Sequence, residues 1–173
     1  MDLSKFKTSD WLKVGGGALF FIAGFRKWWK IDLGSLGSAG NNGWDYFFTT
    51  GIAWLLLVAV AVVTVLKVMN FKMPADLPWP LVILAATLVS LLLVLIRFLS
   101  DGTGVDGSGL SRGVGAFLGM IAAIAAFAGA IMGFREAGGD FNDLKDVNKL
   151  KAEFAKGGGD APPPPPMVPP TPQ

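Results

Sequence analysis

The chain contains neither cysteine nor histidine among its 173 residues. Structural disulfides, thiolate nucleophiles, iron–sulfur clusters, imidazole-bound haem and the usual zinc sites each need one of these side chains, so all are excluded. Charged residues are also scarce, at 16% of the chain against about 25% in a typical soluble domain. The net charge of +2 is too small for a nucleic-acid-binding surface. We therefore expect no nucleic-acid partner, no metal site and no cofactor.

Long uncharged apolar runs take the place of the missing charge. Hydrophobic residues make up 52% of the chain, and its mean hydropathy is +0.52. About 20 helical residues cross the roughly 30 Å of hydrocarbon in a bilayer. Residues 46–66, 79–96 and 113–134 are close to this length and uncharged. They predict membrane spans over residues 46–66, 79–99 and 113–134.

The first apolar segment, residues 11–29, is a weaker candidate. Its uncharged part, residues 14–25, covers roughly 18 Å as a helix. It spans only if Trp11 and Lys13 lie at one interface and the cations and tryptophans of residues 26–29 lie at the other. A cleaved signal peptide is the alternative, but the bulky, cationic residues that follow Phe25 do not suit a cleavage site. The sequence thus predicts an all-α fold, a four-helix transmembrane bundle formed by residues 11–134.

The positive charges predict the orientation of this bundle. An even number of spans places both termini on one side, and the side richer in lysine and arginine is cytoplasmic. With the termini inside, ten of the 15 lysines and arginines are cytoplasmic and five lie outside. We expect a multi-pass protein of the cell membrane with both termini cytoplasmic, residues 1–10 being the N-terminal segment.

The stretch "GFRKWWKID" (residues 24–32) has the composition of an interfacial anchor, because cations snorkel and tryptophan favours headgroup depth. The alternative is a binding patch for an acidic lipid headgroup or partner. The candidate residues are Arg26, Lys27, Trp28, Trp29 and Lys30. In the outer loop that follows, the stretch "GSLGSAGNNG" (residues 34–43) predicts a flexible segment. The second outer loop, residues 101–109, has too few carboxylates for a calcium loop and predicts a flexible turn.

The last span is rich in small residues. Gly115, Gly119 and Ala123 recur every four residues, a spacing that lets helix backbones approach closely in lipid. Two partners remain open for this face. It packs against the protein's own spans, or against another membrane protein or a second copy of the chain.

The composition changes abruptly after residue 134. Residues 135–156 predict an amphipathic cytoplasmic helix whose apolar face docks on the bilayer surface or on a protein. That face consists of Phe141, Leu144, Val147, Leu150 and Phe154. Residues 157–173 are rich in glycine and proline and predict a disordered tail, either solvated or read by an aromatic groove.

Four stretches carry a resemblance to a known group of proteins. They are "KFKTSDWLKVGGGALFFIAGF", "NNGWDYFFT", "LPWPLVIL" and "GFREAGGDFNDLKDVNKLKAEF". Together they resemble actinobacterial four-span integral membrane proteins of unassigned function, from which "RKWW" departs. The resemblance implies four spans and an envelope location, and it implies no activity.

The function expected from these features is non-catalytic. The spans have no charged residue in their cores, where pumps and proton-coupled transporters need one, and the scattered carboxylates and lysines indicate no catalytic pair. We expect an accessory or scaffold protein that recruits a membrane-protein partner, or a second copy, by helix packing and the cytoplasmic arm. The alternative is a handler of lipid or small molecules that binds anionic membrane lipid at the aromatic and cationic rim of residues 26–30.

Overall fold

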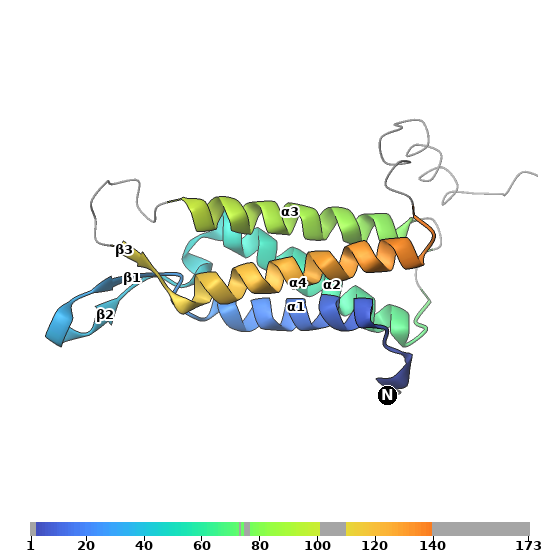
Figure 1. Cartoon of the computed structure of the whole chain (residues 1–173), viewed down its shortest axis with the longest axis horizontal. Helices are drawn as coiled ribbons and strands as arrows, with labels where there is room; N and C mark the ends of the chain where they lie inside the picture. Colours follow the sequence, from blue (N-terminus) through green and yellow to red (C-terminus); the bar gives the residue numbers. More distant parts are fainter. Residues whose placement is uncertain (1–2, 73, 75–76, 101–109, 140–173) are drawn as a thin grey trace, which may run out of the picture.

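Four α-helices lie side by side in the protein (Figure 1). The computed structural model describes residues 3–72, 74, 77–100 and 110–139. The helices are α1 (Thr8–Gly24), α2 (Ile52–Val68), α3 (Trp79–Leu99) and α4 (Val114–Glu136). Successive helices run in opposite directions, so Thr8 and Glu136 lie at one end of the bundle, here called the terminal end (Figure 1). The α1–α2 connection, the end of α3 and the start of α4 lie at the opposite end (Figure 1).

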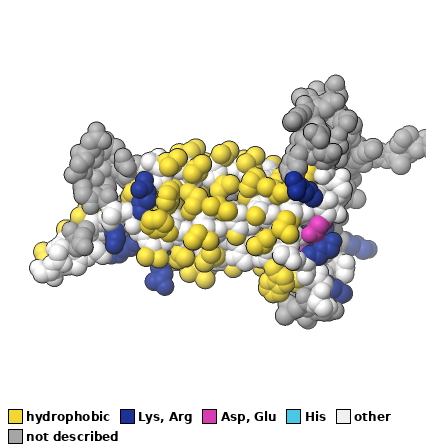
Figure 2. Space-filling model, in the orientation of Figure 1, with side chains coloured by type: hydrophobic (Ala, Val, Ile, Leu, Met, Phe, Trp, Pro, Cys, Tyr) yellow, Lys and Arg dark blue, Asp and Glu magenta, His cyan; other side chains and the backbone are white. Residues whose placement is uncertain are grey.

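Three of the helical segments are long and apolar enough to cross a membrane. They are Phe47–Val68, Trp79–Leu99 and Val114–Glu136, which confirms the segments predicted from residue 46 onwards. The first of them opens with a π-helical turn, Phe47–Gly51, before α2. The third helix opens with Pro80 in its first turn, where a missing N–H costs nothing. Figure 2 shows a wide apolar band with lysine and arginine near both ends.

The prediction of four spans is therefore confirmed for three. Helix α1 is 17 residues long and carries Asp10 and Lys13. It ends at Gly24, so the predicted segment 11–29 is not one continuous helix. A span at α1 remains a proposal.

A small antiparallel sheet at the end opposite the termini was not predicted. It consists of β1 (Trp29–Asp32), β2 (Ser38–Ala39) and β3 (Leu110–Arg112), in the order β2-β1-β3. Ile31 pairs with Ala39 on one side and with Leu110 on the other. The predicted flexible loop is thus a hairpin, whose turn uses positive φ angles at Gly34 and Gly37. We call this the sheet end.

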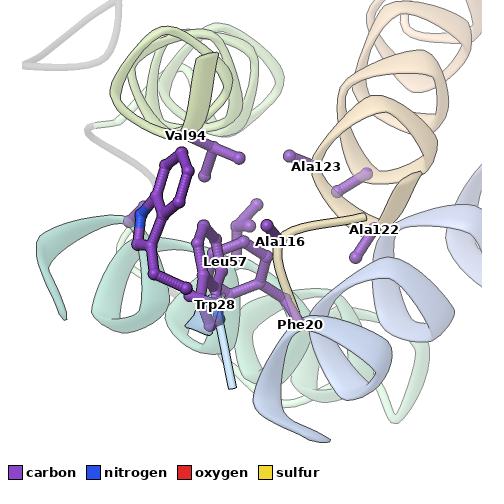
Figure 3. Packing of buried hydrophobic residues seen from close by; sticks show 10 residues of the cluster. Phe20, Trp28, Leu57, Val94, Ala116, Ala122 and Ala123 are labelled. Carbon is purple, nitrogen blue, oxygen red and sulfur yellow. The ribbon is translucent and has the colours of Figure 1, made fainter. Parts of the chain in front are cut away.

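All four helices contribute to the buried core. Of the helix pairs, α1 packs most extensively against α4. Figure 3 shows Phe20 of α1 and the alanines of α4 gathered around Trp28. Gly115, Gly119 and Ala123 are all buried, and Cβ atoms added at the two glycines would lie 2.6 to 2.8 Å from the Trp28 ring. Of the two predicted partners for this small-residue face, the structure shows the protein's own Trp28.

Gly15 and Gly16 provide a matched pair for testing this close packing. A Cβ at Gly16 would lie 2.8 Å from the backbone oxygen of Ala122, whereas a Cβ at Gly15 would have nothing within 4 Å. We expect Gly16→Ala to lower the free energy of unfolding by about 1–3 kcal/mol through overpacking. Gly15→Ala is expected to leave it unchanged or raise it by up to about 1 kcal/mol through helix propensity. Thermal unfolding of the two variants in mild detergent measures this difference, and equal midpoints would contradict the α1–α4 packing.

Candidate functional site

Trp28 and Trp29 are enclosed by protein at the sheet end. The side chain of Trp28 is 0% exposed and that of Trp29 is 4% exposed. The indole Nε1 of Trp28 donates to the Ala23 carbonyl oxygen at 2.9 Å, and its ring meets Phe20 edge-on with centroids 6.0 Å apart. The structure therefore encloses the two tryptophans of the predicted anchor, because α1 ends before them and the chain folds them inward. Arg26 and Lys27 are exposed and Lys30 is half-buried, so the cations remain available at the surface.

Two arginines lie against aromatic rings at the sheet end. The Arg97 guanidinium lies over the Tyr46 ring, 3.3 Å from its centroid, and 5.5 Å from the Trp29 ring. Arg112 lies 5.6 Å from the Trp29 ring and 5.0 Å from that of Phe98. Its Nε also donates to the Phe98 carbonyl oxygen at 2.9 Å. Such cation–π contacts stabilise arginine where water is scarce.

Asn41 holds the two rings beneath Arg97 in place. Its backbone oxygen accepts from the amides of Trp28 and Trp29, at 2.8 and 3.3 Å, and its own amide donates to the Trp29 oxygen at 3.1 Å. Its side-chain Nδ2 donates to the Tyr46 hydroxyl at 3.2 Å. Asn41 thus fixes both the backbone of Trp29 and the Tyr46 ring, over which the Arg97 guanidinium lies.

Sequence reasoning missed the arginines as site residues. The predicted topology did place Arg97 and Arg112 on the same side of the membrane as residues 26–30. Arg97 meets Tyr46 and Trp29 from helix α3. Arg112 meets Trp29 through the pairing of β1 with β3, in which the two residues lie opposite each other. No pattern in the sequence indicates that pairing.

The described salt bridges lie at the terminal end, where Lys5, Lys67 and Lys72 nevertheless form none. Among the residues that the structure describes, the salt bridges join Lys7 to Glu136 at 3.5 Å and Lys13 to Asp10 at 2.8 Å, both at the terminal end. The cations of the sheet end form no salt bridge with a described carboxylate. They are Arg26, Lys27, Lys30, Arg97 and Arg112. Lys27 binds Ser38 instead, through its backbone oxygen and its hydroxyl. The described part of the sheet end therefore attracts anions.

The terminal end forms a polar contact between α1 and α4. Lys13 is 6% exposed, although the sequence predicted a snorkelling lysine at the interface. Ser9 donates to the Glu136 carboxylate at 3.0 Å. Gly133 leaves room for the lysine, since a Cβ there would lie 3.0 Å from its Nζ. This cluster satisfies its charges internally, which indicates a structural role.

Other predicted features have simpler outcomes. Within residues 3–139, apart from the short undescribed segments, no group of three or more carboxylates could hold a metal ion. The predicted docking face of residues 141–154 and the proline-rich tail lie outside the described residues.

Comparison with known proteins finds no matching family model, no matching curated protein and no matching solved structure. The resemblance to actinobacterial four-span proteins therefore stays a prediction. The case for a function depends on the geometry of the sheet end.

The buried Lys13–Asp10 pair gives a prediction about stability. We expect Asp10→Asn to lower the free energy of unfolding by about 3 kcal/mol, because it leaves a buried ammonium without a counter-charge. Adding Lys13→Met to the same chain should recover most of this loss, since the lone charge is gone. Chemical unfolding of the single and double variants in detergent measures both values. A double variant no more stable than Asp10→Asn alone would contradict this interpretation.

Proposed function

We propose that the chain is a non-catalytic integral membrane protein that retains anionic lipid at its sheet end. The observation that carries the proposal is the set of five cations there, which lack a described carboxylate partner and border an apolar band (Figure 2). Lysine and arginine at the edge of a bilayer each favour anionic headgroups by about 1 kcal/mol. The aromatic rings beneath Arg97 and Arg112 hold two of these charges at a fixed place.

We also propose that α1 is a fourth span, with both termini in the cytoplasm of a cell-membrane protein. In support, α1 lies along α4 for most of its length (Figure 1). Its buried Lys13 is neutralised by Asp10, which lowers the cost of placing this helix in lipid. The sheet end would then face outward.

The accessory or scaffold role remains a second proposal. The small-residue face of α4 is occupied by the protein's own Trp28, so that face is not its docking surface. An apolar groove of about 450 Å³ between α1 and α2, with Val14, Phe21 and Val62 in its lining, offers one instead. Its shape and lack of polar lining suit a transmembrane helix of a partner protein.

Lipid retention tests the first proposal directly. We expect the triple variant Arg26→Gln, Lys27→Gln, Lys30→Gln to lose affinity for anionic lipid by about 1 kcal/mol per cation. The matched control replaces three exposed lysines of the other end, Lys5, Lys67 and Lys72, by glutamine. Quantifying lipid that co-purifies in mild detergent compares the two. If both variants retain as much as the natural chain while a protein co-purifies in stoichiometric amount, the scaffold role is favoured instead.

Single cysteines test the topology cleanly, because the chain has none of its own. Leu36 is 86% exposed in the hairpin turn, and Lys5 and Lys72 are exposed at the other end. We expect an impermeant maleimide to label Leu36→Cys on intact cells and to label Lys5→Cys and Lys72→Cys only after permeabilisation. Labelling of Lys5→Cys and Leu36→Cys from the same side would contradict a span at α1. Complete reversal would invert the orientation.

A further inference from the structure

Several side-chain polar atoms at the sheet end are buried without a hydrogen-bond partner among the described residues; Thr50 Oγ1 and Trp54 Nε1 lie apart, and three others are donors of two neighbouring side chains. These three donors are Nε1 of Trp29 and the Nε and Nη2 atoms of Arg97. Their side chains are neighbours, since the guanidinium lies 5.5 Å from the Trp29 ring. Native proteins rarely leave buried donors unpaired, and an unpaired charged group costs more than a neutral one. The arrangement therefore indicates an acceptor supplied from outside the described chain.

The geometry restricts what this acceptor can be. The Tyr46 ring covers one face of the guanidinium, so its N–H groups remain as an in-plane fork. Such a fork matches two oxygens of a phosphate or carboxylate. The indole N–H of Trp29 is a third donor from a different side chain and needs a further oxygen or lone pair. A tetrahedral oxyanion offers three oxygens where a carboxylate offers two.

Of the two arginines stacked on aromatic rings, Arg97 has an Nε without a described acceptor and Arg112 does not. Both arginines lie against aromatic rings at the same end. The Nε of Arg112 already donates to the Phe98 carbonyl oxygen, whereas Nε of Arg97 has no described acceptor. Arg97 is half-buried as a whole, although its Nε and Nη2 atoms are themselves buried.

We propose that Arg97 and Trp29 form a site for one phosphate oxyanion, with Tyr46 as its aromatic platform. This inference rests on the proposed function and sharpens it, because it adds a single defined site to the diffuse cationic surface of residues 26–30. The phosphate belongs to a lipid headgroup or to a free phosphate ester. The surface cations attract anions of either kind towards the site.

The test uses the full chain, delipidated in dodecyl maltoside, a detergent without phosphate. The indole and arginine Nε resonances are followed by ¹⁵N NMR during titration with short-chain phosphatidylglycerol and, separately, with inorganic phosphate. We expect a saturable one-to-one shift of the Trp29 indole and Arg97 Nε signals. The Trp28 indole, which already donates to Ala23, is the internal control and should not move. This readout needs no substitution.

Variants then assign the site. Arg97→Met is expected to weaken the one-to-one binding at least about tenfold, as loss of charge-assisted hydrogen bonds implies. Arg112→Met removes the same charge at the same end and should change it much less. Trp29→Phe keeps an aromatic ring but removes the indole donor, and should weaken binding by an intermediate factor.

The outcomes separate the possibilities. Binding of the lipid alone assigns the phosphate to a headgroup, and binding of both probes assigns a site for free phosphate esters. The proposal is overturned if neither probe shifts the Trp29 and Arg97 signals. It is also overturned if Asp101→Asn or Asp106→Asn, in the loop outside the described residues, shifts them without phosphate, because a carboxylate of the chain would then be the acceptor.

The glutamine variant of Arg26, Lys27 and Lys30 distinguishes this site from the broader proposal. If the surface function fails, that variant retains all its lipid while the Trp29 shift persists. If only the Arg97 site fails, the variant loses lipid and the Trp29 signal never moves. The two results cannot be confused.

Discussion

The rest of the structure depends on the burial of Trp28 between α1 and α4. Its indole is fully enclosed, and only glycine at positions 115 and 119 leaves space for the ring. The backbone at the start of α4 is also bonded to the segment that carries this ring. The Gly113 amide donates to the Trp28 oxygen at 2.8 Å, and the Gly115 amide donates to the Lys27 oxygen at 3.0 Å. These contacts bring the start of α4 to the end of α1. The strand that precedes α4 is thereby placed beside β1, which closes the sheet.

The sheet is small, but it determines the chemistry of its end of the protein. By fixing Trp29 opposite Arg112, it places an aromatic ring beside two arginines, Arg97 of α3 and Arg112 of β3. Asn41 adds Tyr46 to the same cluster. The terminal end is organised differently, because there carboxylates of α1 and α4 neutralise lysines. The terminal end thus pairs Lys7 and Lys13 within the chain, whereas the sheet end pairs none of its cations with a described carboxylate.

The sequence predicted the membrane segments after residue 46 closely, because length and apolar character are local properties. It predicted close helix approach at Gly115 and Gly119 for the same reason, but left the partner open. The sheet escaped prediction because strands of two to four residues carry no usable period, and because β1 and β3 lie far apart in the chain. Trp28 and Trp29 were assigned to an anchor since composition beside a span does not distinguish a ring facing lipid from one enclosed by protein. Arg97 and Arg112 became site residues only through tertiary contacts with Tyr46, Trp29 and Phe98.

The pairing of α1 with α4 has a consequence for the order in which the protein is made. α1 leaves the ribosome first, yet the helix against which it packs most extensively is the last one described. Until α4 is made, a short helix with three consecutive glycines lacks its main neighbour. Trp28 then lacks the glycine surface that encloses it, and Ser9 lacks the Glu136 carboxylate. A chain interrupted before α4 therefore displays polar groups that the finished protein hides, a difference by which membrane quality control can separate incomplete from complete molecules.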